Sequence, residues 1–328
     1  MHWIINPKGD LYEKWKVFVS EHEQRNFFQS FEFVNIYESN GYIVNTFVAF
    51  DDEKIVASYN VLFLKEQFGI FSSLTKRAVS WGMPLTNSML IIKETLNTVI
   101  EKCKNDFIFF EIRPLYPLSS EENNTLQELN FRIEQHYTVF NPLNTNFFDF
   151  YHSGRKKNIR RAQRNRLISF KELETSEELN NAGELIIALY KKLRLPCPDI
   201  DFFNSIKDYP SVKTFGVFYN NKMIACRIIL TYLNSIYDWY AAASEEGKTF
   251  FANDYIVHEI FIWGQKKGFS HFDFGGAGTS NQNYGVRDYK LKFGGNLVEI
   301  GRVFYINKPI SYRLGKIGFK ILKLLRGK

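Results

Sequence analysis

The residues best suited to chemistry lie between Phe272 and Gly295, where the chain reads FDFGGAGTSNQNYGVRDYKLKFGG. Asp273 stands on an alternating stretch, typical of a strand, that stops at Gly275 and Gly276. Two glycines after a strand let the backbone approach a ligand closely, because no Cβ stands in the way. Lys290 follows a polar loop. An acid at a strand end, a flexible loop and a lysine together suit a reaction in which negative charge develops.

A short helix is predicted from Val286 to Phe293, because Gly294 and Gly295 follow it as glycines follow a last helical turn. Arg287 and Tyr289 lie on this helix beside the lysine. A structural alternative stays open, in which the whole segment is a tight strand–loop–helix connection and the lysine is a surface side chain.

These motifs, in this order, resemble the C-terminal block of the FemABX family, the peptidoglycan-bridge aminoacyltransferases. The matching residues are Asp273-Phe274-Gly275-Gly276, Gly285-Val286, Tyr289-Lys290 and Phe293-Gly294-Gly295. The family usually has an aromatic residue and a lysine ahead of the final Phe-Gly-Gly, and Tyr289 takes the aromatic place. The resemblance implies two tandem GNAT-like acyl-CoA N-acyltransferase domains.

An internal repeat supports two similar halves. Residues 47–57 (FVAFDDEKIVA) align with residues 215–225 (FGVFYNNKMIA), and both read as a β-hairpin with a polar turn. Each hairpin is followed by a predicted helix, a strand with one acid and an extended aromatic stretch. In the first half the helix covers 94–104, the acid is Glu111 and the aromatic stretch covers 135–140. In the second half the helix covers 254–267, the acid is Asp273 and the aromatic stretch covers 298–306. The chain is therefore predicted to be an α/β protein (α+β, mixed sheet) of two tandem domains.

We expect a first GNAT-like domain over residues 1–150 and a second over residues 151–310. The tail, residues 311–328, is expected to form a basic amphipathic helix that returns to the first domain, as the family resemblance implies. Its apolar stripe is Ile310, Leu314, Ile317, Ile321 and Leu324. A second interpretation stays open, in which this helix lies on an anionic membrane.

Composition narrows the class of protein. The chain has 328 residues, of which 45% are hydrophobic and 17% aromatic, with no apolar run near the length of a membrane span. The N-terminus shows no secretory signal. Three widely spaced cysteines argue against a metal site or a disulfide framework and suit a reducing cytoplasm. The net charge of +7 favours an anionic partner such as RNA, a nucleotide, a phospholipid surface or a polyanionic substrate. No DNA partner is expected.

Positive charge is concentrated in a predicted linker helix from Arg155 to Arg166, where seven of twelve residues are Lys or Arg. Like charges one turn apart repel, so this face is easier to explain if an anion offsets it. Arg155, Arg160 and Arg164 are therefore predicted to contact an anionic donor. A solvated surface helix is the alternative.

Acyl transfer to an amine passes through an oxyanion, which needs cations or donors aimed at it. Lys290 is the predicted cation, and the loop from Gly276 to Gly285 the predicted source of backbone N–H groups. Tyr289 would position the donor, and Asp273 is the first candidate base, with His258 and Asp254 as others. Replacing the lysine by Met is expected to lower turnover and to leave thermal stability nearly unchanged.

The identity of the donor is the open question. Coenzyme A usually binds on a glycine-rich turn at a helix N-terminus, whereas Glu245 to Asn253 is acidic and poor in glycine. Aminoacyl-tRNA, the donor that the resemblance implies, suits the basic charge. No tightly bound cofactor is expected, and either aminoacyl-tRNA or acyl-CoA would be the co-substrate. The predicted substrate- and donor-binding residues are Gly275, Gly276, Arg287, Gly294, Gly295, Asn253, Arg155, Arg160 and Arg164.

Three functions remain. The first is aminoacyl transfer from tRNA to an amine of a cell-envelope precursor, either peptidoglycan or a surface polysaccharide. The second is an N-acyltransferase that uses acyl-CoA or an acyl carrier and acts on a sugar nucleotide or lipid precursor. The third is a non-catalytic protein of the same fold that binds RNA or a membrane. A cytoplasmic protein, with peripheral contact to the inner membrane as an option, fits all three.

Overall fold

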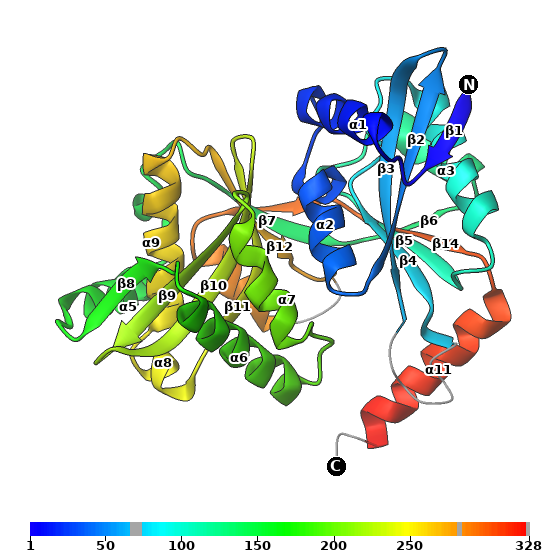
Figure 1. Cartoon of the computed structure of the whole chain (residues 1–328). Coiled ribbons are helices and arrows are strands. Elements are labelled where there is room, and N and C mark those ends of the chain that lie inside the picture. The colour runs from blue at the N-terminus through cyan, green and yellow to red at the C-terminus, as the bar shows by residue number, and fades with distance from the viewer. Residues whose placement is uncertain (66–73, 281–283, 326–328) are drawn as a thin grey trace. The chain divides into compact units, whose positions relative to one another are not determined.

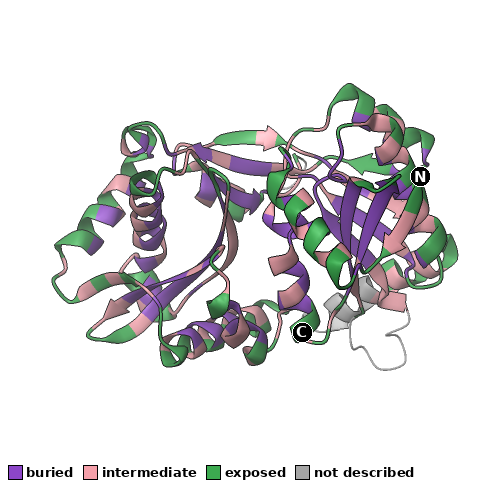
Figure 2. Cartoon of the chain, turned by 45° about the horizontal axis from the view of Figure 1, so that its top comes forward, coloured by how far each residue is buried: buried purple, intermediate pink, exposed green. Residues whose placement is uncertain are grey.

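The computed structural model describes residues 1–65, 74–280 and 284–325, with side chains of the last helix described as far as residue 318. The chain forms two compact units, Met1–Gln135 with Ile300–Lys328, and His136–Glu299. Each unit is a sheet covered by helices (Figure 1), and buried residues gather on the strands of both sheets (Figure 2). The predicted α/β fold with mixed sheets is confirmed.

The sheet of the first unit has seven strands. In spatial order they are β1 (His2–Ile5), β2 (Ile43–Asp51), β3 (Lys54–Leu64), β4 (Arg77–Trp81), β5 (Phe109–Arg113), β14 (Arg302–Ile306) and β6 (Arg132–Glu134). Strands β4 and β5 run parallel, and the other neighbours are antiparallel. The parallel pair requires a crossover, which a helix between the two strands supplies.

Helices cover both faces of this sheet. They are α1 (Asp10–Glu21), η1 (Phe27–Gln29), α2 (Phe31–Ser39), α3 (Met89–Cys103), the crossover helix, α4 (Ser120–Glu128) and α11 (Pro309–Leu325). On β3, Ser58 accepts a hydrogen bond of 2.7 Å from Trp15 of α1. The next residue, Tyr59, points to the opposite face and belongs to the core that contains Leu96 of α3.

The sheet of the second unit repeats this plan. In spatial order its strands are β13 (Asn296–Glu299), β7 (Tyr137–Pro142), β12 (His271–Gly276), β11 (Ser235–Ala243), β10 (Lys222–Tyr232), β9 (Val212–Tyr219) and β8 (Ile168–Glu172). Its helices are η3 (Phe147–Phe150), α5 (Ser153–Arg164), α6 (Ser176–Leu193), α7 (Ile200–Ser205), η4 (Ile206–Asp208), α8 (Glu245–Thr249), α9 (Ala252–Lys266) and α10 (Gly285–Leu291). Read from the opposite end, the order of strands is that of the first sheet, with β11 and β12 as the parallel pair.

Two helices pack on opposite faces of β10. The thiol of Cys226 lies 3.4 Å from the carbonyl of Ala182 in α6, whereas the next residue, Arg227, reaches Asn253 in α9. Neighbouring strand residues point to opposite faces, so α6 covers one face of the sheet and α9 the other.

The two predicted hairpins form, and they share one irregularity. Asn220 and Asn221 turn between β9 and β10 with φ of 49° and 63°, a conformation that asparagine tolerates. Each hairpin then has a register shift just after the turn, which leaves Val56 of β3 extra in the first and Ile224 of β10 extra in the second. The repeat therefore extends to the position of the bulge.

The last aromatic stretch of each half of the sequence forms a strand in the sheet of the other unit. Strand β7 pairs with β12 and β13, and β14 pairs with β5 and β6. For this reason the division falls after Gln135, while the sequence placed it at residue 150. Residues 136–150 belong to the second unit, and the segment from Ile300 onward belongs to the first.

The last helix packs by a face that the sequence did not predict. The Tyr312 ring meets Phe109, with ring centroids 5.3 Å apart, so α11 contacts the first unit. The predicted docking stripe is instead exposed: Ile310 by 76%, Leu314 by 51% and Ile317 by 55%. The side chains of Ile321 and Leu324 lie outside the described residues. Across the described ranges, no helix combines the length and apolarity needed to span a bilayer.

Candidate active site

The parallel strands of the second unit separate partway along their length. Residues 235–237 of β11 pair with residues 271–273 of β12, and the register ends at Tyr237 and Asp273. Both strands continue, β11 to Ala243 and β12 to Gly276. Ligands of open α/β sheets bind where strands end and diverge. The gap between β11 and β12 beyond Tyr237 and Asp273 is therefore the candidate site.

The end of β12 carries a bulge. The register between β12 and β7 shifts between Asp273 and Gly276, and Gly275 has φ of +66°. A Cβ on Gly275 would lie 3.2 Å from the Tyr237 hydroxyl. Residues other than glycine rarely adopt this φ, so the bulge explains the first glycine of the pair.

Asp273 is a buried acid at this bulge. Its Oδ1 accepts hydrogen bonds from the Thr138 hydroxyl and, at 2.8 Å, from the backbone N–H of Gly275. Burial raises the pKa of Asp273 to about 6, although both hydrogen bonds and the charge of Lys290 oppose the rise. A carboxyl with a pKa near neutrality is suited to accept a proton.

Lys290 of α10 is buried against the same strand end. Its Nζ donates to the carbonyls of Phe274 at 2.6 Å, Gly275 at 3.3 Å and Gly276 at 2.8 Å. Burial lowers the pKa of Lys290, while the charges of Asp238 and Asp273 raise it. The alternative of a surface lysine is therefore wrong. The ammonium holds three successive carbonyls in place at the gap.

Arg227 and Asp238 form an ion pair at the gap that sequence reasoning missed. The guanidinium lies 2.6 Å from Asp238 Oδ2 and 2.9 Å from Asn253 Oδ1, and the Arg227 side chain is 3% exposed. Within the described part of the chain, Arg227 Nε and Asp238 Oδ1 are buried without a hydrogen-bond partner. Buried polar atoms are rarely left unpaired, so these two can receive a polar group of a ligand. We call Arg227, Asp238, Asp273 and Lys290 the gap cluster.

Tyr289 joins this cluster to α5. Its hydroxyl donates to the Asn253 carbonyl at 2.9 Å, and the Arg155 guanidinium stacks 4.4 Å from its ring centroid. Burial raises the pKa of Tyr289, so the phenol stays neutral. The structure thus brings together the predicted Asp273, Tyr289, Lys290 and Asn253.

Comparisons with solved structures identify the fold. FemX superposes with a TM-score of 0.70 at 14% sequence identity, over 96% of this chain and 99% of that one. The chain has a FemX-like fold. No sequence family matches the chain, and no curated protein does.

Two further structures share the FemX-like fold. L-PGS from Bacillus licheniformis has a TM-score of 0.60 at 16% identity, over 92% of this chain and 95% of that one. A tandem GNAT protein from the clavulanic acid biosynthesis pathway has a TM-score of 0.58 at 8% identity, over 93% of this chain and 99% of that one. The predicted FemABX-like fold of tandem GNAT domains is confirmed. At these identities the similarity concerns the fold alone.

Arg155 has a different place from the one predicted. It is 7% exposed, pairs with Asp254 and donates to the Tyr289 carbonyl at 3.2 Å. Asp254 also accepts from Asn158 at 2.9 Å, so this pair fastens α5 to α9. Arg155 is therefore not part of the exposed basic face, and Asp254 is held in an ion pair, which makes it a poor base.

The basic helix α5 runs over Ser153–Arg164, so Arg166 of the predicted range lies outside it, and the predicted contact with an anionic donor stays a prediction. Arg160 and Arg164 are exposed, together with Lys157 and Arg161. The Arg160 guanidinium lies 5.6 Å from the ring centroid of Phe148. We call Lys157, Arg160, Arg161 and Arg164 the basic face of α5, and it can accept phosphate groups.

Gly294 and Gly295 are explained by packing. Gly294 has φ of +75°, and a Cβ there would lie 2.6 Å from the Cβ of Phe150. A Cβ on Gly295 would collide with Asn141 Oδ1. Both glycines let the end of α10 approach neighbouring residues closely, and the atoms nearest to an added Cβ belong to Phe150, Asn141 and Val139.

Other predicted residues lie at the edge of the site. The Arg287 guanidinium donates to the Thr279 carbonyl at 2.6 Å and so fastens the start of α10 to the loop after β12. A Cβ on Gly276 would lie 2.9 Å from His136 Nε2. The loop expected to supply N–H groups lies partly outside the described residues, at 281–283.

His258 is a core residue. It is packed among aromatic rings, including Phe147 and Phe148, and burial lowers its pKa to about 4. A neutral imidazole enclosed by rings cannot reach a substrate, so Asp273 is the remaining candidate base.

The segment that precedes α9 differs from a glycine-rich phosphate turn. It forms the short helix α8, in which Glu245 pairs with Lys192 at 2.8 Å and Glu246 with Lys222 at 3.2 Å. Helix α9 then begins after Phe251, which has φ of 58°. Negative side chains at this place disfavour a pyrophosphate.

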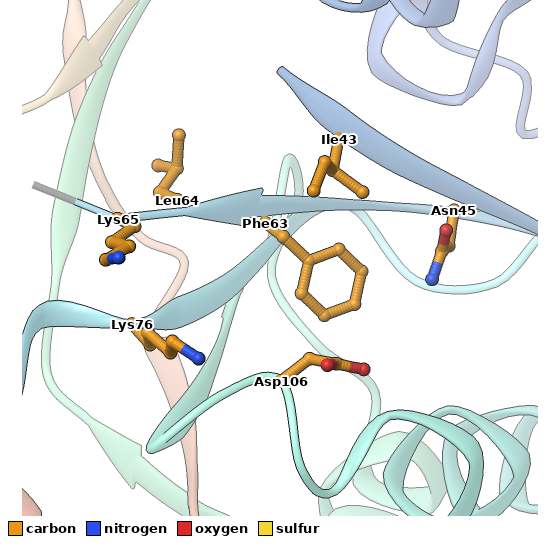
Figure 3. Close-up of a pocket in the computed structure, with 7 residues that line it drawn as sticks. All are labelled: Ile43, Asn45, Phe63, Leu64, Lys65, Lys76 and Asp106. Carbon is orange, nitrogen blue, oxygen red and sulfur yellow. The ribbon is translucent and has the colours of Figure 1, made fainter. Parts of the chain in front are cut away.

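A pocket of about 410 Å³ opens in the first unit, at the end of β3 (Figure 3). The Phe63 ring and the Lys76 ammonium point into it, and Lys65, Asn45 and Asp106 line it further. These side chains suit a small ligand with a negative group. Sequence reasoning did not single out any of them.

Proposed function

We propose that this chain is an N-acyltransferase of the FemABX type that transfers an aminoacyl group from aminoacyl-tRNA to an amine of a cell-envelope precursor. The observation that carries the proposal is the gap cluster, with its two cations and two acids, at the point where β11 and β12 separate. The FemX-like fold supports the reaction class.

The roles follow from the chemistry of acyl transfer. The attacking amine must lose a proton, and Asp273, with its pKa raised to about 6, is the proposed acceptor. Negative charge develops on the carbonyl oxygen, and Lys290 is the proposed stabilising cation. As the amide bond forms, the ester bond to the tRNA breaks, and the ribose hydroxyl leaves with the proton that Asp273 had accepted. Because its Nζ contacts three carbonyls, it also acts by fixing the end of β12. Tyr289, anchored on Asn253, would position the donor.

Two features favour tRNA over coenzyme A as the donor. The basic face of α5 offers four exposed cations, which suit an RNA backbone. The segment that precedes α9, where a pyrophosphate would bind, carries Glu245 and Glu246. The runner-up is an N-acyltransferase that uses acyl-CoA or an acyl carrier and acts on a sugar nucleotide or a lipid precursor. A non-catalytic RNA- or membrane-binding protein is the third candidate.

The proposed acceptor is an amine on an anionic envelope precursor, and the proposed site of action is cytoplasmic. A lipid acceptor is suggested by another structural neighbour, the C-terminal domain of a putative lysylphosphatidylglycerol synthetase from Agrobacterium fabrum. Peptidoglycan or surface-polysaccharide precursors remain our first choice, since the C-terminal motifs of this chain resemble those of FemABX.

One calorimetric comparison tests the proposal. Uncharged tRNA and coenzyme A are titrated separately into the full chain at the same salt concentration. We expect binding of tRNA, weakened when Arg160 and Arg164 are replaced by Gln. Binding of coenzyme A alone would transfer the proposal to the acyl-CoA alternative, and binding of both without any transfer to an amine would favour a non-catalytic protein.

A further inference from the structure

Helix α11 has two apolar sides, and one of them attaches it to the first unit. Tyr312 meets Phe109 on β5. A Cβ on Gly315 would lie 2.9 Å from the carbonyl oxygen of Leu74, so the helix backbone runs close to that segment. Tyr312, Gly315 and Gly318 are half-buried and lie three residues apart, on one side of the helix.

The other side is an exposed apolar stripe. Ile310, Leu314 and Ile317 follow the spacing of one helical face and are exposed by 76%, 51% and 55%. Single exposed apolar side chains are common on proteins, whereas three in one row are a sign of an interaction surface. We call these three residues the outer stripe.

Basic residues flank the outer stripe. Lys308, Arg313 and Lys316 are exposed, and the Lys316 ammonium lies 4.8 Å from the ring centroid of Tyr312, on the side of the helix toward the first unit. From Gly301 to Lys328 the sequence has eight Lys or Arg and no acid. The described part of α11 and the turn before it thus expose three cations and no acid, so a partner of the stripe must tolerate apolar contact and provide negative charge.

We propose that the outer stripe of α11 docks on the surface of an anionic lipid bilayer. The stripe would enter the boundary between headgroups and acyl chains, and the flanking cations would contact the headgroup phosphates. RNA would satisfy the cations and leave the apolar residues without a role. A second copy of the chain would bring two cationic flanks together, which like-charge repulsion opposes. This inference is independent of the reaction proposed above.

The test measures partition of the full chain onto vesicles of phosphatidylcholine, with and without phosphatidylglycerol. We expect binding to the anionic vesicles and weak binding to the neutral ones. The double variant L314Q/I317Q should bind about tenfold more weakly or worse, because two apolar side chains are lost from the bilayer. The variant R313Q/K316Q should bind about 25-fold more weakly, at roughly fivefold for each charge.

Matched controls come from the same unit. I43Q/L90Q changes two side chains exposed by 63% and 74%, and K14Q/K54Q removes two exposed charges. Both should bind vesicles as the parent chain does. All four variants should keep the parent melting temperature, because the changed side chains are exposed.

Several results would overturn the proposal. Absence of binding to anionic vesicles would do so, as would equal weakening by I43Q/L90Q. A lowered melting temperature in L314Q/I317Q would mean that the stripe packs inside the protein. If the parent chain is dimeric without lipid and L314Q/I317Q is monomeric, the stripe serves a second copy. If R313Q/K316Q loses tRNA binding and keeps vesicle binding, the cations serve RNA. These measurements record binding, melting and oligomeric state and involve no acyl transfer, and the tRNA used is uncharged, so failure of vesicle binding leaves the proposed reaction standing.

Discussion

The two units have matching sheets and differ at the positions where chemistry would occur. In the matched register, Tyr59 and Ser80 of the first unit correspond to Arg227 and Asp238 of the second. Tyr59 is neutral and donates to the Gly82 carbonyl at 3.2 Å, whereas Arg227 and Asp238 are a buried ion pair. Equivalent positions thus hold a neutral hydrogen bond in one unit and two charges in the other.

The acids of the equivalent strands differ in the same way. Glu111 lies 3.0 Å from Arg113 and 3.3 Å from Arg302. Burial alone would raise the pKa of Glu111, but these guanidinium groups outweigh it and lower the pKa. Asp273 lacks such a partner within hydrogen-bond range in the described chain, and burial raises its pKa to about 6. The first acid serves ion pairing, and the second is suited to proton transfer.

The sheets also separate at different places. In the first unit β4 and β5 pair along five residues, and the separation lies between β3 and β4. There Gln29 bridges the strands: it accepts from the Asn60 N–H at 2.8 Å and donates to the Trp81 carbonyl at 2.9 Å. In the second unit β11 and β12 separate, and charged side chains lie there. A shared fold therefore does not imply a shared site, and the second unit is the one to test.

The largest effect is expected from breaking the Arg227–Asp238 pair. R227M leaves a buried carboxylate without its cation, and the free energy of unfolding should fall by about 3–5 kcal/mol. Guanidinium denaturation of the purified variant measures it. In the first unit, Y59F removes one neutral hydrogen bond and should cost about 1 kcal/mol.

A double variant separates charge from packing. R227M/D238L removes both charges and should recover most of the stability that R227M loses. If Y59F costs as much as R227M, the contrast between the two units is one of packing and not of charge.

Lys290 gives the next largest effect. K290M removes the cation proposed to stabilise the oxyanion, and turnover with the true donor and acceptor should fall by about 10² to 10³. The structure changes the stability expectation: Nζ binds three carbonyls, so the melting temperature should fall as well. K292M, an exposed lysine two residues on, is the control and should match the parent in both measurements. Full turnover in folded K290M would contradict the assignment.

Local patterns allowed much of the architecture to be predicted. The hairpins, the acid-bearing strands and the helix before Gly294 follow from turn residues, alternation and glycine position. The exchange of β7 and β14 was not predictable, because pairing between strands far apart in the sequence leaves no local signal. The same holds for α11, whose two sides are both apolar, so that its partner decides which one is buried.

The site was predicted in part for the same reason. Asp273, Tyr289 and Lys290 were singled out because glycines mark the strand end beside them and because the segment resembles the FemABX block, and their roles stay predictions. The burial of Lys290 could not be foreseen, since it depends on the position of β12. Arg227 and Asp238 were missed, although a lone charge inside the apolar run IACRIIL is a usable signal of a buried polar site.

Opposite pH dependences would sharpen the contrast between the two acids. The folded pKa of Asp273 is raised from 3.8 to about 6, so the folded state binds its proton more tightly, and stability falls as the pH rises through this window. The pKa of Glu111 in the folded state is lowered from 4.5. The stability that this carboxylate adds to the folded protein is therefore present above pH 4.5 and is lost as the pH falls below that value.

The measurement compares melting temperatures of the parent, D273N and E111Q from acid to neutral pH. As the pH rises from about 4 to 6, the free energy of unfolding of D273N should increase relative to that of the parent, by up to about 3 kcal/mol. E111Q should be less stable than the parent at neutral pH and should approach it in acid. Parallel curves for the two variants would mean that the environments of the two acids do not differ.

The smallest expected effect concerns the basic face of α5, which is compared with scattered lysines of the first unit. If the donor is RNA, R160Q/R164Q removes about two phosphate contacts and lowers affinity for all RNA sequences alike. The slope of log K against log salt should shrink by roughly one to two. K14Q/K54Q removes the same charge from the first unit and should leave the slope unchanged, because those lysines lie on separate elements. Equal slopes in both variants would mean that net charge, and not this helix, attracts RNA. An unchanged slope in R160Q/R164Q alone would make α5 an ordinary solvated helix, and the tRNA donor would lose its electrostatic support.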